Sequence, residues 1–187
     1  TLFHFLIKKQ CMIPVGRIIL KVYHWFLLHI NQTNREGKLN SMKNNILSKL
    51  KNFDTPTICN GLELLDNKFK LHGYSKEKFF CLNPKIKPMI GYAKTAKISS
   101  LKHNKKTKSS IRVDYYEYVN KGDFPKISII QDQHKNPVGS FWGEVNANIH
   151  NKLGCLGVIT NGSVRDLDVI PKNFQFLSKT LSPSHAE

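Results

Sequence analysis

Hydrophobic and polar positions are arranged differently before and after Met42. In residues 1–41, apolar clusters such as Trp25-Phe26-Leu27-Leu28 are interrupted by basic side chains, so no stretch reaches the roughly 18 to 20 uncharged residues of a membrane-spanning helix. We therefore predict that residues 1–41 are an extension outside the conserved fold and that one domain spans residues 42–187. An organelle-targeting or amphipathic presequence is the alternative, because the extension has no acidic residue before Glu36.

After Met42, the spacing of apolar residues predicts two helices and a strand. The first helix carries apolar residues at helical spacing: Ile46, Leu50 and Phe53. Asp54 can cap a second helix, which has Pro56 in its first turn and runs to Leu65. The alternating pattern of residues 89–98 predicts a strand.

A charged segment and a group of tyrosines come next. Residues 99–110 carry five cations, counting the histidine, and a single apolar side chain, so we expect an exposed loop. Tyr115, Tyr116 and Tyr118 follow. We expect them to pack in an amphipathic helix or a loop, since stacking on nucleic-acid bases is the weaker alternative.

Residues 126–160 are predicted to form a strand, a helix and a second strand. The short and nearly continuous apolar runs at 126–132 and 155–160 are typical of buried strands. The helix begins at Gly143 and ends at Gly154, where a C-cap glycine belongs. Three residues form the apolar stripe that we expect to face the core: Val145, Ile149 and Leu153.

This unit predicts an α/β fold with a ligand-binding edge. A right-handed crossover makes the two strands parallel, so the start of the helix and the loop after the second strand emerge at the same carboxyl edge of the sheet. We expect a turn at Asn161-Gly162 to open that second loop. Open α/β folds hold their ligands at this edge.

The two loops carry complementary chemistry. The first helical turn offers unpaired backbone N–H groups, and the helix dipole favours a carboxylate or phosphate there. The residues of this turn are Gly143, Glu144, Val145 and Asn146. In the second loop, the planar guanidinium of Arg165 suits a carboxylate, and Asp166 is an oxygen ligand of the type that Mg²⁺ prefers. By contrast, we expect His185 to be a loop or packing histidine and Asp132 to be a turn residue after its strand.

Charge and cysteine content add little to this site. The net charge of +16 and the pI near 9.8 favour polyanions, but only four of the 29 basic residues are Arg. The abundant Lys, Asn, Ile and Phe are also what AT-rich codons encode, so we do not expect a nucleic-acid partner. The four cysteines form no C-x-x-C pair, which argues against a zinc site and indicates buried, reduced thiols in a cytoplasmic protein. They are Cys11, Cys59, Cys81 and Cys155.

Five motifs carry a resemblance to a known family. They are Phe53-Asp-Thr-Pro-Thr-Ile-Cys-Asn60, Met89-Ile-Gly-Tyr-Ala, Phe141-Trp-Gly-Glu-Val-Asn-Ala, Leu153-Gly-Cys-Leu-Gly-Val-Ile-Thr-Asn-Gly-Ser-Val-Arg-Asp166 and Ser182-Pro-Ser-His-Ala. Over about residues 50–187, the chain resembles the RraA-like family, which includes 4-hydroxy-4-methyl-2-oxoglutarate aldolases with oxaloacetate decarboxylase activity. The resemblance implies a swivelling β/β/α-type domain with N-terminal helices, assembled as a homotrimer or homohexamer. It also implies that this chain is truncated at the C-terminus.

The resemblance assigns roles to the same residues. It implies that the helix start from Gly143 to Asn146 and the side chain of Arg165 bind the pyruvyl part of a 2-oxoacid. Asp166 would hold Mg²⁺ or Mn²⁺ largely through waters, and Glu144 would lie near that water shell. The resemblance thus implies a lyase that releases pyruvate, with Arg165, Asp166 and Glu144 as catalytic residues. The alternative is a non-catalytic protein that regulates a ribonuclease by binding it, and the intact Arg165-Asp166 pair favours the enzyme.

Overall fold

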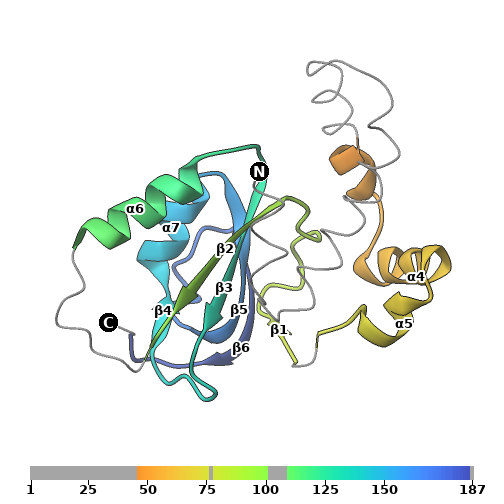
Figure 1. Ribbon diagram of the computed structural model, residues 1–187. Coiled ribbons are helices and arrows are strands. Elements are labelled where there is room, and N and C mark those ends of the chain that lie inside the picture. The colour runs from red at the N-terminus through yellow and green to blue at the C-terminus, as the bar shows by residue number, and fades with distance from the viewer. Residues whose placement is uncertain (1–45, 76–77, 101–108, 186–187) are drawn as a thin grey trace. The chain divides into compact units, whose positions relative to one another are not determined.

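The computed structural model of the chain describes residues 46–75, 78–100 and 109–185 (Figure 1). The predicted extension of residues 1–41 lies outside these ranges, as does most of the predicted loop at 99–110. The chain forms two compact units, of which one holds the helices α4 and α5 and the other holds the sheet.

The first unit confirms the predicted capped helix. Helix α4 spans Thr55–Leu65, and α5 spans Lys68–His72. The side chain of Asp54 accepts a hydrogen bond from the backbone N–H of Thr57 at 2.8 Å, which satisfies one of the N–H groups that a helix start leaves unpaired. Pro56 occupies the first turn, where its missing N–H costs nothing. Local sequence therefore determines where this helix begins.

The second unit is built on a mostly parallel sheet, which confirms the α/β class. Its strands are β1 Phe80–Cys81, β2 Tyr92–Ile98, β3 Lys126–Asp132, β4 Ser140–Trp142, β5 Cys155–Val164 and β6 Gln175–Leu181. They are ordered β1-β6-β5-β3-β2, and β4 pairs with β5 outside this path. Only β1 runs antiparallel among the described pairs. The predicted strands at 89–98, 126–132 and 155–160 are β2, β3 and the first part of β5.

Two helices lie on the same face of this sheet (Figure 1). Helix α6, Ser109–Asn120, connects β2 to β3, and α7, Glu144–Lys152, connects β4 to β5. Two tyrosines of α6 pack toward α7: the hydroxyl of Tyr115 bonds the ring of His150 at 2.8 Å, and that of Tyr116 donates to Asn146 at 2.7 Å. The expected amphipathic helix is thus confirmed.

The core lies between these helices and the sheet. Its buried members come from six strands and helices and from the segment before β6: Val119, Ile130, Trp142, Ala147, Cys155, Val158, Val164, Phe174 and Phe176. The indole of Trp142 lies against the rings of Phe174, Phe176 and His150, with centroids 6.0, 6.2 and 4.4 Å away. Large buried rings contribute much of the apolar area that a small core removes from water.

The predicted turn at Asn161-Gly162 is wrong, because β5 continues to Val164. Asn161 acts as a substitute for backbone pairing: its side chain accepts from the N–H of Asp132 at 2.7 Å and donates to the carbonyl of Asp132 at 2.9 Å. The register shifts between Thr160 and Ser163, which is typical of a bulge. An Asn-Gly pair can therefore lie inside a strand when the side-chain amide of the asparagine forms hydrogen bonds with the backbone of a neighbouring strand.

The predicted apolar stripe of α7 is wrong at Val145, whereas Ile149 is half-buried and Leu153 packs against the core as expected. Val145 is 69% exposed, whereas Ala147 and His150 are fully buried. A histidine can occupy the core here because both ring nitrogens have partners, Tyr115 on one side and the carbonyl of Asn146 at 2.7 Å on the other. Apolar spacing alone missed the buried position of His150, since it counts histidine as polar.

Two smaller expectations change as well. Asp132 is not a turn residue but the last residue of β3, and it is only 2% exposed. Of the described cysteines, all of which are free, only Cys155 is buried as predicted. Cys59 is half-buried and Cys81 is exposed. Gly154, in contrast, ends α7 as predicted, with a φ of 83° that L-residues rarely adopt.

Candidate functional site

The site begins where β4 and β5 end side by side. Ser140 pairs with Ser163 and Trp142 with Val164 in parallel register, and the N–H of Arg165 donates to the carbonyl of Trp142 at 2.9 Å. The first half of β5 pairs with β3, and the second half of β5 pairs with β4 along the same edge. The sequence pattern predicts no strand at 140–142, and the first strand of the predicted unit was β3. The two chain segments that leave β4 and β5 are therefore adjacent from their first residues.

This adjacency brings Asp166 onto the start of α7. The N-cap residue, Gly143, has no side chain to cap the helix, and the carboxylate of Asp166 does so from the segment that follows β5. Its Oδ2 accepts a hydrogen bond from the backbone N–H of Glu144 at 3.2 Å. Asp166 has a φ of 58°, a left-handed conformation that Asp and Asn tolerate better than most residues. Part of the predicted cradle of amides is thus already occupied by the protein's own carboxylate.

The rest of the first turn is available to a ligand. The first intrahelical hydrogen bond runs from the N–H of Ala147 to the carbonyl of Gly143 at 3.0 Å. The N–H groups of Val145 and Asn146 therefore have no intrahelical acceptor, and the helix dipole adds positive potential at this end. An anionic group would be stabilised there.

Gly143 is required for this close approach. A Cβ atom at Gly143 would lie 2.4 Å from Oδ2 of Asp166, 3.1 Å from Cγ of Arg165 and 3.2 Å from its Nε. Contacts below 3.0 Å cannot be accommodated without movement, so any larger residue would displace the Asp166 carboxylate from the helix start. The glycine is explained by packing and not by backbone strain, because its φ of −159° is ordinary extended backbone.

Arg165 is held beside Asp166 at the surface of the site. Its Nε lies 3.4 Å from Oδ2 of Asp166, and the two side chains are 37% and 33% exposed. An Nη1 atom donates to the carbonyl of Pro183 at 3.5 Å. Solvent screens a pair with this much exposure, so the contact orients the guanidinium more than it stabilises the fold.

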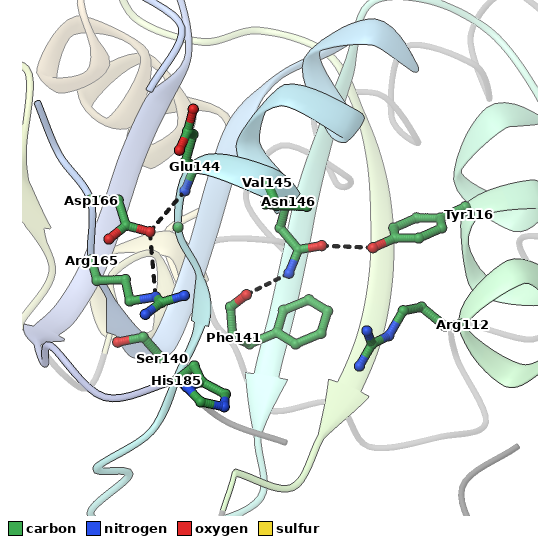
Figure 2. A pocket seen from close by; sticks show the side chains of 11 residues that line it. Arg112, Tyr116, Ser140, Phe141, Glu144, Val145, Asn146, Arg165, Asp166 and His185 are labelled. Atoms are coloured by element: carbon green, nitrogen blue, oxygen red, sulfur yellow. Dashed lines mark hydrogen bonds and ion pairs between the residues drawn. The ribbon is translucent and has the colours of Figure 1, made fainter. Parts of the chain in front are cut away.

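These residues line one pocket of about 410 Å³, within the range of small-molecule sites (Figure 2). Its lining consists of Arg112, Tyr116, Ser140, Phe141, Gly143, Glu144, Val145, Asn146, Arg165, Asp166 and His185. All six residues that the sequence analysis selected are present. His185, expected to be a loop or packing histidine, is an exposed residue of the lining.

Helix α6 contributes two residues to the pocket that the sequence did not predict. Arg112 and Tyr116 are four residues apart, so they share one helical face, and that face meets the pocket. The i, i+4 spacing of the two residues was visible in the sequence, but nothing local to α6 shows that this face meets α7. Ser140 and Phe141 were missed because β4 was not predicted.

Asn146 is oriented by a chain of hydrogen bonds behind the pocket. Its Oδ1 accepts from the hydroxyl of Tyr116 at 2.7 Å, and its Nδ2 donates to the carbonyl of Phe141 at 2.5 Å (Figure 2). Its own carbonyl bonds the ring of His150, which in turn bonds Tyr115. Burial lowers the pKa of His150 to about 4, although the bond to Asn146 opposes the shift, so the ring is neutral near pH 7. Burial also raises the pKa of Tyr115 and of Tyr116, which keeps both hydroxyls protonated as donors.

The oxygen donors of the pocket fit a divalent cation that keeps most of its waters. Within the described residues, no group of three or more His, Cys, Asp or Glu side chains is placed to hold a metal. The pocket carboxylates are Glu144 and Asp166. Mg²⁺ is commonly bound through one or two carboxylates together with waters and substrate, so this small donor set fits it. A structural zinc site would need more side-chain ligands.

Comparison with known proteins assigns the family. An α/β domain with a carboxylate and a guanidinium at the carboxyl ends of its strands matches the model of the RraA-like family, described as Aldolase/RraA, over residues 55–187. The chain belongs to this family. No curated protein matches it.

A solved structure shares the fold. The chain is similar to Streptomyces coelicolor RraAS2, described as an unusual member of the RNase ES inhibitor RraA protein family, with a TM-score of 0.53 and 15% identity. The alignment covers 76% of this chain and 66% of RraAS2, so the chain spans slightly less than two thirds of that protein's length. No helix of the described residues is long and apolar enough to cross a membrane.

Proposed function

We propose that the pocket binds a 2-oxoacid and that the protein, with Mg²⁺ or Mn²⁺, cleaves a carbon–carbon bond to release pyruvate. The substrates we propose are 4-hydroxy-2-oxoacids of the 4-hydroxy-4-methyl-2-oxoglutarate type, together with oxaloacetate, which would be decarboxylated. The observation that carries the proposal is the meeting of Arg165 and Asp166 with the first turn of α7 in one pocket.

The chain's own residues account for substrate binding. The guanidinium of Arg165 offers a planar pair of donors to the substrate carboxylate, and the N–H groups of Val145 and Asn146 add donors from the helix start. Asn146 keeps its orientation because Tyr116 and Phe141 hold both ends of its amide. A substrate held by several fixed groups reacts faster, since its orientation is determined before the bond breaks.

The same residues account for charge stabilisation. Asp166, with Glu144 nearby, would hold the divalent cation largely through waters. When bound, the cation would supply Lewis-acid stabilisation of the negative charge that develops on the 2-oxo oxygen as the bond breaks. Arg165 would add a fixed positive charge beside that oxygen.

A pyruvate-release assay tests the proposal. The purified full chain is incubated with 4-hydroxy-4-methyl-2-oxoglutarate or oxaloacetate and with Mg²⁺ or Mn²⁺, and pyruvate is measured with and without chelator. We expect metal-dependent release that falls by roughly 100-fold or more in Arg165→Ala, because one positioned charge commonly contributes this much. Lys172→Ala, which removes an exposed cation outside the pocket, serves as the control. Release that is unchanged in Arg165→Ala would refute the proposed site.

A non-catalytic regulator is the second candidate, favoured by the likeness to RraAS2. This function predicts a stable complex with a ribonuclease and no pyruvate release with any metal. The intact Arg165-Asp166 pair at a pocket favours the enzyme, because a surface that only binds a protein does not need a metal-type carboxylate beside a helix start. A pull-down that captures a ribonuclease, from a preparation inactive in the pyruvate assay, would reverse this preference.

We also propose that the protein assembles as a homotrimer or homohexamer, as the family resemblance implies. Light scattering coupled to gel filtration measures the mass directly. A monomer at micromolar concentration would contradict this proposal and leave the proposed chemistry to be judged by the pyruvate assay alone.

A further inference from the structure

A second arginine faces the pocket from α6. Figure 2 shows Arg112 and Arg165 entering the pocket from opposite sides, with Asn146 and Phe141 between them. Arg112 lies one helical turn before Tyr116, whose hydroxyl is fixed on Asn146 at 2.7 Å. This bond anchors the face of α6 that carries Arg112 against the start of α7.

The two arginines differ in what already engages them. Arg165 lies 3.4 Å from Asp166, and Glu144 follows on the same side of the pocket, so both pocket carboxylates lie on the side away from Arg112 (Figure 2). Among the described residues, no ion pair or hydrogen bond engages the guanidinium of Arg112. The positive charge of Arg112 acts on a residue of the pocket lining: it opposes the increase in the pKa of Tyr116 that burial causes. The pocket therefore has a cation without a counter-charge on the side away from the reacting groups.

We propose that Arg112 binds the distal carboxylate of a dicarboxylic 2-oxoacid and so makes the pocket selective for diacids over monoacids. This inference rests on the proposed function, which places the 2-oxo end of the substrate at Arg165 and Asp166. A ligand with acid groups at both ends meets one guanidinium at each end. A planar guanidinium suits a carboxylate because it can donate two parallel hydrogen bonds.

The expected selectivity follows from the strength of such contacts. A hydrogen bond between charged groups contributes enough to change affinity by roughly tenfold or more. A monoacid leaves Arg112 in water, where it stays hydrated, so the loss of the contact lowers affinity without blocking entry. The selectivity should therefore appear as a ratio between the affinities for diacid and monoacid. This ratio should fall to near one when Arg112 is replaced.

Binding of unreactive ligands tests the inference without turnover. 2-Oxoglutarate and 2-oxopentanoate have the same five-carbon chain and differ in a terminal carboxylate against a methyl group. Isothermal calorimetry on the full chain with Mg²⁺ present should give tighter binding of 2-oxoglutarate to the wild type, by roughly tenfold or more. In Arg112→Gln this preference should fall to near one. Lys121→Gln, which removes an exposed cation just beyond the end of α6, should keep the preference and so controls for general charge.

Turnover gives a second reading, with separate outcomes. In Arg112→Gln, kcat/KM should fall more for 4-hydroxy-2-oxoglutarate than for 4-hydroxy-2-oxopentanoate, again by roughly tenfold or more. Arg165→Gln should weaken both ligands and both substrates. Equal losses for diacid and monoacid in Arg112→Gln, or no loss for either, would overturn the role of Arg112. If the wild type binds both acids with the expected preference but releases no pyruvate, the proposed chemistry fails while the diacid site stands.

Discussion

The carboxylate of Asp166 caps the helix that begins at Glu144, 22 residues earlier in the chain, through a hydrogen bond of 3.2 Å to its backbone N–H. A helix cap is usually supplied by the residue just before the helix, and here that residue is Gly143, which has no side chain to offer. One oxygen of Asp166 is thus used structurally. No hydrogen bond from the described residues reaches the other oxygen, Oδ1, which is therefore the oxygen that the proposed function assigns to the cation.

Gly143→Ala should damage function more than stability. The new Cβ would lie 2.4 Å from Oδ2 of Asp166, a flexible side-chain end that can move away. The loss of one cap should cost about 1 kcal/mol of unfolding free energy, whereas a displaced carboxylate should lower kcat/KM by roughly 100-fold. Urea unfolding and pyruvate release measure the two effects. A variant that loses stability and activity in proportion would contradict this account.

Gly61→Ala is the matched control for that substitution. Gly61 lies within α4, and a Cβ there would meet nothing within 4 Å. The variant should be more stable by about 0.5 to 1 kcal/mol, because alanine restricts the unfolded chain and favours a helix. Its pyruvate release should match the wild type.

Asp166→Asn should weaken the binding of a divalent cation while keeping the fold. Asn is close in shape to Asp and tolerates the left-handed backbone at this position, where φ is 58°. Substitution of residues that only support a metal ligand changes metal affinity by about 10 to 100-fold. Loss of the ligand's own charge should therefore lower the affinity for Mn²⁺ by more than roughly 100-fold. Electron paramagnetic resonance of Mn²⁺ measures this without turnover. Asp168→Asn, an exposed neighbour, should bind as the wild type does, and equal affinity in all three proteins would exclude Asp166 as the ligand.

Tyr116→Phe tests whether Asn146 must be oriented. The substitution removes the hydroxyl that donates to Oδ1 of Asn146 at 2.7 Å. We expect a stability loss of about 1 kcal/mol and a fall in kcat/KM of roughly tenfold, because the amide can then rotate. Tyr74 is an exposed tyrosine of the unit that holds α4 and α5, so Tyr74→Phe should change neither stability nor kcat/KM. Unchanged kinetics in Tyr116→Phe would show that Phe141 alone holds the amide.

The buried His150 predicts how stability depends on pH. Burial lowers its pKa from 6.5 to about 4 in the folded protein, so between these values the unfolded chain binds a proton that the folded chain does not. The free energy of unfolding should therefore be highest above pH 6.5 and fall as the pH decreases toward 4, by up to roughly 3 kcal/mol.

Urea midpoints at pH 7.5 and pH 5 measure this slope. His150→Gln should be less stable at pH 7.5, because a core contact is lost, but its midpoint should change less between the two pH values. His72→Gln, at an exposed histidine of α5, should keep the wild-type slope. An equal slope in His150→Gln would mean that other groups control the acid sensitivity.

Local patterns predicted the elements whose stability is mostly local. The cap at Asp54, the buried strand at 126–132 and the C-cap at Gly154 all follow from neighbouring residues, and each lies where the sequence placed it. Local patterns gave wrong predictions where a residue has a hydrogen-bond partner far away in the sequence. Asn161 stays in a strand because Asp132 uses its amide, and His150 enters the core because Tyr115 and Asn146 pair with its ring.

The sequence by itself determined that Gly143–Asn146 and Arg165–Asp166 belong at one edge of a parallel sheet, since strand and helix periodicity and the direction of a crossover are local or topological properties. Tertiary structure alone decided that β4 completes the edge of β5, that Asp166 occupies the amide of Glu144, and that Arg112 and Tyr116 join the pocket from α6. These features depend on contacts between residues far apart in the chain. No spacing within a single helix or strand specifies which neighbour its exposed face will meet.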